Sequence, residues 1–291
     1  MDKHREEEMQ LLKVIYEIRQ DHPTMGMRDM YYKIMPSTLG RDAFETFCKS
    51  YDLWSIKPKN YSRTTDSSGV IRFADLLKDV HLTGINQSWQ SDITYFELNN
   101  RFYYITFIID SYSRRIVGHY TSKSLHTRET TLAALQVAVR TRKEQNVKGL
   151  IFHSDGGGQY YAKEFLTETR RLGFKNSMCE FAWENCKAER INGVIKNNYL
   201  KHRNITNKEE LIREVDRAVE LYNSEKPHIA LKRKSPNTFE NDLVSLQQQT
   251  GSMMKESLIA IRQISWASSP GKSEQTRSQN QDVLNAIHSL E

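Results

Sequence analysis

Residues 91–110 read SDITYFELNNRFYYITFIID and predict two strands joined by a tight turn. Polar and apolar residues alternate from Ser91 to Leu98, the pattern of a strand with one buried face. Asn99-Asn100 is a hairpin turn signal, and the more apolar run 101–110 predicts a second strand after it. Residues 115–120 predict a third strand, so we expect an antiparallel meander at the centre of the chain.

Helices and strands alternate after this meander. Short buried strands are predicted at residues 147–155 and 176–179. Helical periodicity covers residues 127–144, 163–172, 185–200 and 208–222. This order predicts an α/β fold of the ribonuclease-H-like kind, a mixed five-stranded sheet flanked by helices, over residues 81–240 together with its C-terminal helices.

The segments on either side of this core have a different composition. Residues 1–55 predict a charged helical segment with helices at 28–35 and 41–51, compatible with a helix-turn-helix, although the pattern favours a plain helical hairpin. Residues 56–80 predict a basic linker. Residues 241–291 predict a tail that is partly helical and then disordered, because its last part is rich in Ser, Gln, Lys and Arg.

The bulk composition restricts the classes of function. Forty-two Lys and Arg against 36 Asp and Glu give a net charge of +6, which fits a polyanionic partner but also fits a basic protein without one. Three scattered cysteines suggest reduced thiols rather than a disulfide framework. The longest apolar run is too short to span a membrane, and the N-terminus lacks a signal-peptide core. We therefore expect a cytoplasmic, nucleoid-associated protein without a membrane partner.

Three carboxylates are the candidate functional residues. Asp92 falls on the first predicted strand, Asp155 ends the strand at 147–155, and Glu189 opens the helix at 185–200. All three can meet at one edge of the sheet, where open α/β sheets tend to place their sites. Buried carboxylates repel one another without a cation, and hard oxygen ligands suit Mg²⁺ or Mn²⁺. Two such ions about 3.5–4 Å apart can support displacement at a phosphodiester.

Other acidic residues compete for these roles. Asp110 is an alternative ligand, but its place before Ser111 favours a turn role. Glu180 and Glu184 lie close to Glu189 in the sequence, and on chemistry alone either could replace it.

The residues around the three carboxylates resemble the catalytic motifs of insertion-sequence transposases with a retroviral-integrase-like core. WQSDITY at 89–95 resembles the first motif, HSDGGGQY at 153–160 the second, and ENCKAE at 184–189 the third. The Tyr-Asn, Pro-His, Leu and Ser-Pro residues within 222–236 are similar to that family's C-terminal pattern. The closest resemblance is to the second-frame (OrfB) protein of the insertion-sequence-3 family.

This resemblance implies a DDE transposase that cleaves DNA strands and transfers them at insertion-sequence ends. It implies that Asp92, Asp155 and Glu189 are the catalytic residues and the ligands of two Mg²⁺ or Mn²⁺ ions. The chain departs from the family in two places. The spacing from Asp155 to Glu189 is shorter than the common form, and Glu184 stands where an Asp is usual. Asn185 anchors the choice of Glu189.

The predicted helix that carries Glu189 also carries candidate DNA-binding residues, Lys187, Arg190, Asn192 and Lys196. Lys196 lies two helical turns beyond Glu189 and so faces the same way; related integrases use a lysine there. Lys187 is equally compatible with an ordinary solvated residue. Trp183 and Tyr160 are candidates for stacking on an unpaired base, or for packing in the core.

The resemblance also implies partners. These are DNA, both element ends and target, a homo-oligomer formed on that DNA, and an upstream-frame partner protein. Two other functions fit the same residues: a nuclease of this fold that cuts without joining, and a non-catalytic DNA-binding partner or regulator of a fused transposase. The fold alone does not separate them.

Overall fold

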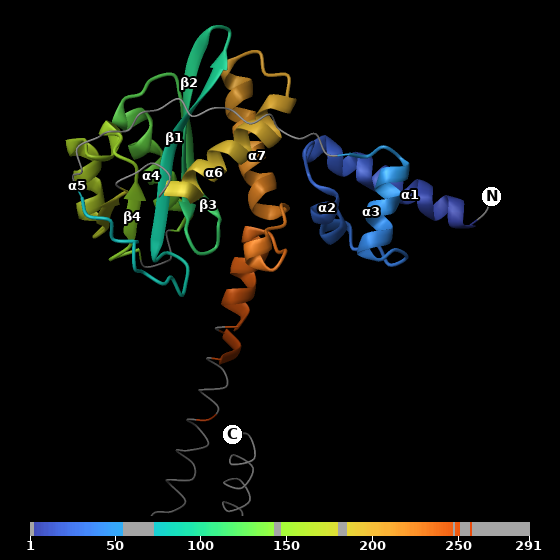
Figure 1. Ribbon diagram of the computed structural model, residues 1–291. Helices are drawn as coiled ribbons and strands as arrows, with labels where there is room; N and C mark the ends of the chain where they lie inside the picture. The colour runs from blue at the N-terminus through green and yellow to red at the C-terminus, as the bar shows by residue number, and fades with distance from the viewer. Residues whose placement is uncertain are drawn as a thin grey trace, which may run out of the picture. The chain divides into compact units, whose positions relative to one another are not determined.

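The computed structural model describes residues 3–54, 73–142, 147–179, 185–246, 248–250 and 257. The chain divides into two compact units, residues 1–239 and 240–291 (Figure 1). Much of the predicted linker and most of the predicted tail lie outside the described residues. No helix in the described ranges is long and apolar enough to cross a membrane.

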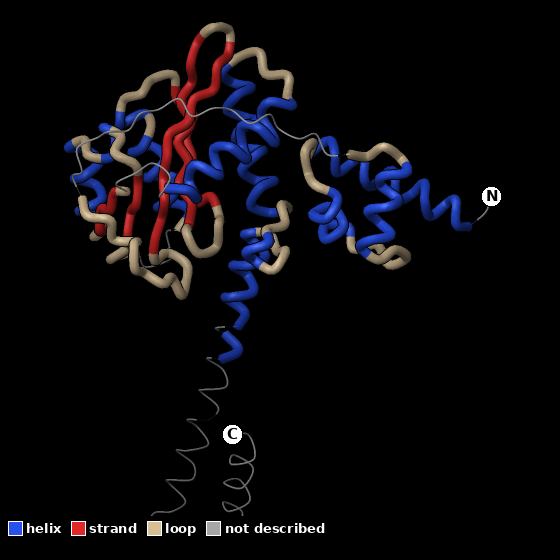
Figure 2. The backbone as a smooth tube through the Cα atoms, viewed as in Figure 1, coloured by secondary structure: helices blue, strands red, loops and turns tan. Residues whose placement is uncertain are grey.

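The described part of the first unit contains a five-stranded sheet in the order β3-β2-β1-β4-β5 (Figure 2). The antiparallel meander consists of β1 (Ser88–Leu98), β2 (Arg101–Asp110) and β3 (Ile116–Ser122). β4 (Ile151–Ser154) pairs parallel to β1, and β5 (Lys175–Met178) pairs parallel to β4. This arrangement confirms the predicted mixed, ribonuclease-H-like sheet.

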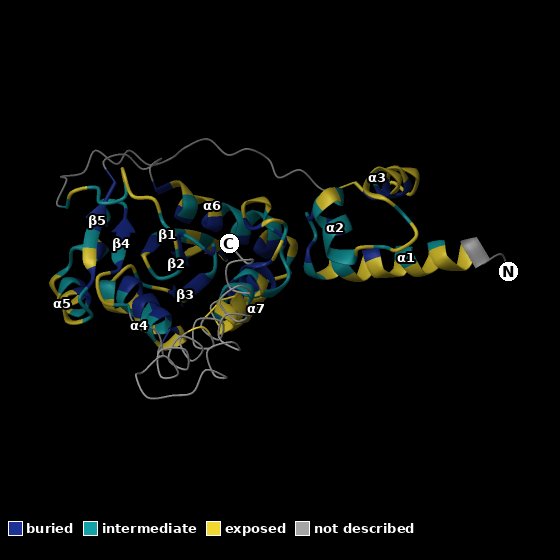
Figure 3. Cartoon of the chain, turned by 90° about the horizontal axis from the view of Figure 1, so that it is seen from below, coloured by how far each residue is buried: buried dark blue, intermediate teal, exposed yellow. Residues whose placement is uncertain are grey.

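Helices pack on both faces of this sheet. Alternate residues of β2 point to opposite faces, and apolar residues on each face are buried under helices. Phe107 belongs to a core shared with α6 (Cys186–Val194) and α7 (Lys208–Ser224). Ile108 belongs to the core under α4 (Thr131–Thr141) and α5 (Lys163–Arg171). Figure 3 shows buried segments, in dark blue, on the strands and on parts of the surrounding helices.

One predicted helix differs in detail. The helix expected over residues 185–200 is α6 followed by a π-helical turn, Ile195–Tyr199, and a 3-10 turn, Leu200–His202. A π turn takes in an additional residue, which a 3.6-residue sequence pattern does not reveal. The turn places Tyr199 in the core shared with α7.

The N-terminal segment forms α1 (Lys3–Asp21), α2 (Met27–Ile34) and α3 (Arg41–Ser50) around a core of their own. Ile15, Met30 and Phe44 are fully buried in that core. The helices predicted at 28–35 and 41–51 correspond to α2 and α3.

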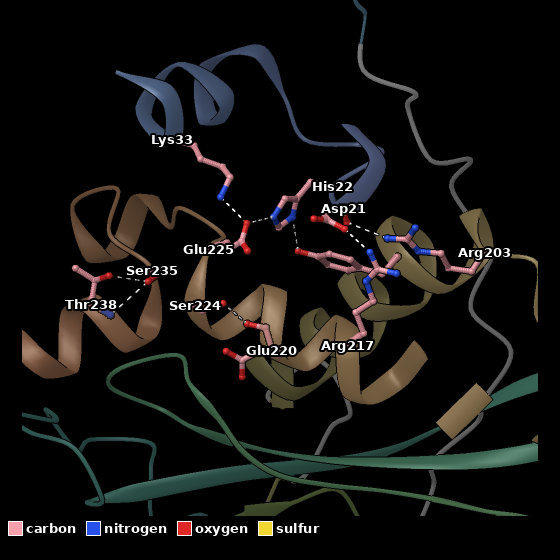
Figure 4. Close-up of polar contacts among 11 residues, drawn as sticks. Asp21, His22, Lys33, Arg203, Arg217, Glu220, Ser224, Glu225, Ser235 and Thr238 are labelled. Carbon is pink, nitrogen blue, oxygen red and sulfur yellow. Dashed lines mark hydrogen bonds and ion pairs between the residues drawn. The ribbon is translucent and has the colours of Figure 1, made fainter. Parts of the chain in front are cut away.

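A polar junction connects these helices to the core (Figure 4). His22 Nε2 lies 3.1 Å from Glu225 Oε2, and His22 Nδ1 lies 3.1 Å from the Tyr199 hydroxyl. A neutral imidazole that donates to the carboxylate and accepts from Tyr199 satisfies both ring nitrogens. Lys33 Nζ is 2.5 Å from the same Glu225 oxygen. Burial lowers the pKa of His22, although Glu225 opposes this shift.

We expect the junction to weaken as the pH falls. The folded-state pKa of His22 lies below its ordinary value, so below about pH 6.5 the unfolded chain binds more protons and folding stability is lost. His22→Gln keeps hydrogen-bonding capacity without this titration. Between about pH 7 and pH 5, its thermal unfolding midpoint, followed by circular dichroism, should fall less than that of the wild type. His81→Gln, at an exposed histidine, is the control; equal slopes for His22→Gln and wild type would contradict the prediction.

Candidate active site

The register between β1 and β4 places two of the predicted carboxylates at neighbouring strand ends. Ser91 of β1 pairs with Ser154 of β4, which is the last pair between these strands. Asp92 and Asp155 are the residues that follow this pair. β1 continues to Leu98, so its edge beyond Ser91 is no longer covered by β4. The site therefore lies at the open edge of a central strand.

Local hydrogen bonds hold both carboxylates. Asp92 accepts one from the backbone N–H of Ile93 at 2.8 Å and one from Asn192 Nδ2, on α6, at 2.7 Å. Asp155 accepts one from the backbone N–H of Gly157 at 3.2 Å. A Cβ atom at Gly157 would lie 3.1 Å from Asp155 Oδ1, so glycine leaves this approach open.

The electrostatics of the pair oppose ionisation. Burial raises the pKa of Asp92, and the charges of Asp155 and Glu189 raise it further, against the hydrogen bonds from Ile93 and Asn192. Burial also raises the pKa of Asp155. Two adjoining, partly buried carboxylates carry this cost unless a cation offsets it. The site therefore has the character of a cation-binding or proton-binding site.

A cavity of about 230 Å³ opens beside the pair. Asp92 and Asp155 line it together with two tyrosines of the β1–β2 hairpin, Tyr95 and Tyr104. Leu125 and Gln159 also line it. Its wall therefore combines acidic groups with aromatic rings.

The third predicted carboxylate lies near this pair without joining it. Glu189 is in the first turn of α6 and is exposed. Its charge acts on Asp92, and Asn192, one turn further along, contacts Asp92 directly. In the ranges that the structure describes, no three His, Cys, Asp or Glu side chains are close enough together to hold a metal ion. Repulsion between like charges is the physical reason to expect this separation without a cation.

The predicted DNA-binding residues divide into two groups. Asn192 contacts Asp92, and the Lys196 ammonium lies 4.6 Å from the centroid of the Tyr95 ring. Lys187 is instead near Arg114. Burial lowers the Lys187 pKa, and the nearby Arg114 charge lowers it further. Arg190 likewise acts on Arg114, whose pKa is lowered mainly by burial. The helical segment from α6 into the π-helical turn therefore presents an amide to Asp92, an ammonium to Tyr95, and basic groups toward Arg114 in the β2–β3 turn.

The other candidates take structural positions or lie outside the description. Tyr160 packs in the core and its hydroxyl is 2.9 Å from Ser91 Oγ, so it is not available for base stacking. Asp110 accepts hydrogen bonds from the backbone N–H groups of Tyr112 and Ser113, a turn role. Residues 180–184, which contain Glu180, Trp183 and Glu184, are outside the described residues.

Sequence reasoning missed Tyr95 and Tyr104. Both line the cavity, and the register pairs them directly across the hairpin. A usable signal was present, because two predicted strands joined by a two-residue turn place these tyrosines opposite each other.

Comparison with known proteins agrees with this geometry. Residues 83–182 and residues 173–236 match families described as Integrase core domain. The 31 kDa protein of insertion element IS600 from Shigella sonnei is 30% identical over 74% of this chain and 81% of the relative. Transposase InsF for insertion sequence IS3A from Escherichia coli (strain K12) is 28% identical over 57% of this chain. The match spans 58% of that transposase.

One solved structure with a similar fold is the HTLV-2 integrase catalytic core domain in complex with magnesium. It is 23% identical, with a TM-score of 0.43, over 53% of this chain and 95% of that chain. A likeness of this size adds nothing to what the sheet topology establishes. The sheet and the sequence matches define an integrase-type core. The chain belongs to the insertion-sequence transposases that carry this core, as the motifs indicated.

We expect Asp92→Asn to stabilise the fold when divalent cations are absent. Because the folded-state pKa of Asp92 is raised, the wild type loses stability as the pH rises above about 4, where the unfolded chain releases this proton. At neutral pH the variant should be more stable by at least about 1.4 kcal/mol, equivalent to one pKa unit. Urea unfolding in EDTA at about pH 4 and pH 7.5 measures the difference.

The difference in free energy of unfolding between Asp92→Asn and the wild type should disappear at the lower pH. Asp79→Asn, at an exposed carboxylate, is the matched control and should change little at either pH. A wild type as stable as Asp92→Asn at pH 7.5 would show that the carboxylate pair carries no such cost.

Proposed function

We propose that this transposase cleaves DNA strands at the ends of an insertion sequence and joins them to a target, with Asp92, Asp155 and Glu189 as its catalytic carboxylates. The observation that carries the proposal is that Asp92 and Asp155 lie next to each other. They follow the last paired residues of β1 and β4, line one cavity, and both have raised pKa values. This is the arrangement expected of carboxylates that work with a divalent cation rather than as surface residues.

The donor set fits Mg²⁺ or Mn²⁺. Carboxylate oxygens are the preferred ligands of both ions, and the cavity leaves room beside them. Asp92 and Asp155 would hold the cations, and Glu189 would complete the set by rotating its exposed side chain inward once its repulsion with Asp92 is relieved. When bound, two ions would supply the positive charge that the attacking and leaving oxygens of a phosphodiester displacement need.

The remaining residues position these groups and the DNA. The Asn192 amide fixes one oxygen of Asp92, and the Gly157 N–H orients Asp155. Lys196 would bind a phosphate next to the carboxylates. Lys187 and Arg190, which lie toward Arg114, would contact the DNA backbone farther from them.

The partners follow from this chemistry. Joining an element end to a target requires two DNA segments, and bringing two ends together requires at least a dimer on DNA. An upstream-frame protein would act as a further partner. A nuclease would use the same carboxylates but would leave its products unjoined.

Asp155→Asn should abolish cleavage and joining. A ligand that holds a catalytic cation is worth several kcal/mol, so we expect a loss of at least about 100-fold. The assay supplies element-end DNA, a pre-cut 3′-hydroxyl end and Mg²⁺, and resolves cut from joined products on a gel. Asp79→Asn is the matched control. Equal products from Asp155→Asn and wild type would reject the catalytic assignment, whereas cut but unjoined products from the wild type would identify a nuclease.

Lys196→Ala should weaken DNA binding and reduce its dependence on salt. Each lost phosphate contact lowers the slope of log K against log salt by about 0.9 for duplex DNA. Fluorescence anisotropy over a range of salt concentrations measures this slope. Lys175→Ala is the control, because Lys175 is exposed at the opposite end of the parallel strands. An unchanged slope for Lys196→Ala would remove Lys196 from the DNA contact.

A further inference from the structure

Three aromatic side chains share one face of the β1–β2 hairpin, beyond the end of β4. Tyr95 lies directly opposite Tyr104, and Phe102 lies opposite Glu97, two residues along β1 from Tyr95. Because side chains alternate along a strand, the three rings point to the same side. The rings of Tyr95 and Phe102 meet edge to face, with centroids 5.3 Å apart. Figure 1 shows this hairpin extending past the other strands.

Two of these rings are open to solvent. Tyr95 is 47% exposed and Phe102 is 50% exposed. A single exposed aromatic residue is ordinary, but two in contact beside a cavity form an apolar patch that is costly to hydrate. Tyr160, one of the two residues that the sequence made candidates for base stacking, is only 4% exposed. The hairpin therefore supplies the accessible ring face that Tyr160 lacks.

The patch adjoins the carboxylates. Tyr95 and Tyr104 line the same cavity as Asp92 and Asp155. The Lys196 ammonium lies 4.6 Å from the centroid of the Tyr95 ring. An aromatic ring, the ammonium of Lys196 and two carboxylates thus lie in one region of the protein. A nucleotide presents a base with a π-face for the ring and a phosphate for the ammonium, and carboxylates that hold divalent cations would accept its adjoining phosphodiester.

We propose that Tyr95 stacks on an unpaired base of the DNA strand, at the nucleotide next to the phosphodiester that would react at Asp92 and Asp155. The inference rests on the proposed function, because that function brings DNA to the carboxylates. Phe102 supports the Tyr95 ring from its edge, and Lys196 contacts the phosphate of the stacked nucleotide. A base inside a continuous duplex has no free face, so the occupant is a frayed or extended end. Stacking tolerates any base, so Tyr95 positions the strand without reading its sequence.

The test measures binding of the full chain to a fluorescent DNA duplex that ends in a short unpaired thymidine extension, with Mg²⁺ present. Loss of one stacked base costs about 1–3 kcal/mol, so Tyr95→Ala should weaken binding about 5- to 150-fold. Tyr95→Phe keeps the ring and should bind like the wild type. Tyr120→Ala is the matched control, because Tyr120 is also exposed but is not among the residues that line the cavity.

A second DNA, with abasic sugars in place of the thymidines, separates stacking from a structural role. The wild type should bind this abasic DNA about 5- to 150-fold more weakly than the thymidine DNA. Tyr95→Ala should bind the two DNAs with nearly equal affinity. If Tyr95 only supported the fold, removing the bases would weaken the variant as much as the wild type. Tyr95→Leu keeps the apolar contact without the π-face and serves if Tyr95→Ala fails to fold.

The outcomes distinguish this inference from the proposed function. Equal binding by Tyr95→Leu, Tyr95→Ala and wild type would overturn the stacking role, even if Asp155→Asn is inactive in joining. An abasic penalty that is the same in wild type, Tyr95→Ala and Tyr95→Leu would overturn it as well. Loss of the penalty in Tyr95→Ala and Tyr95→Leu would support stacking regardless of the joining assay, because the measurement reports binding and not joined products.

Discussion

The parallel pairing of β1 with β4 is the constraint on which the site depends. A slip of one residue would turn every side chain of β1 to the other face of the sheet. The register is held by apolar packing, because Trp89 and Phe152 are directly paired and both are buried in the same core. Burying a side chain such as Phe152 is worth about 1.5–3 kcal/mol. Several such residues outweigh the repulsion that the same register creates between Asp92 and Asp155.

The α6 helix is anchored at the same point. Asn185 Nδ2, just before α6, donates to the backbone carbonyl of Ser91 at 2.9 Å, and Asn192 donates to Asp92. These two bonds fix the first turns of the helix against β1. The backbone of Glu189 is therefore positioned by contacts that do not involve its own side chain. The amide hydrogen bonds and the apolar residues stabilise the fold. The carboxylates that they position destabilise it through repulsion and desolvation.

The sequence was informative where one strand or helix carries its own pattern. Alternation located β1 and β2, and the end of an apolar run placed Asp155 where β4 stops. It was uninformative where the outcome depends on distant partners. His22 and Glu225 are 203 residues apart, and no local pattern pairs them. The Tyr160 hydroxyl likewise finds its hydrogen-bond partner, Ser91, on another element. The charge of Arg114, in the β2–β3 turn, lowers the Lys187 pKa after burial does, and no helical pattern encodes this proximity.

The open edge of β1 explains both the carboxylates and the aromatic patch. An exposed strand edge invites pairing with another chain, and proteins protect such edges with charges or covering groups. Beyond Ser91, the groups near this edge are Asp92, Tyr95 and the ammonium of Lys196. A further β-strand would have to bury the carboxylate and the ammonium at a large cost. In the proposed function, a nucleic acid strand would instead bring a phosphate for the Lys196 ammonium and a base for the Tyr95 ring.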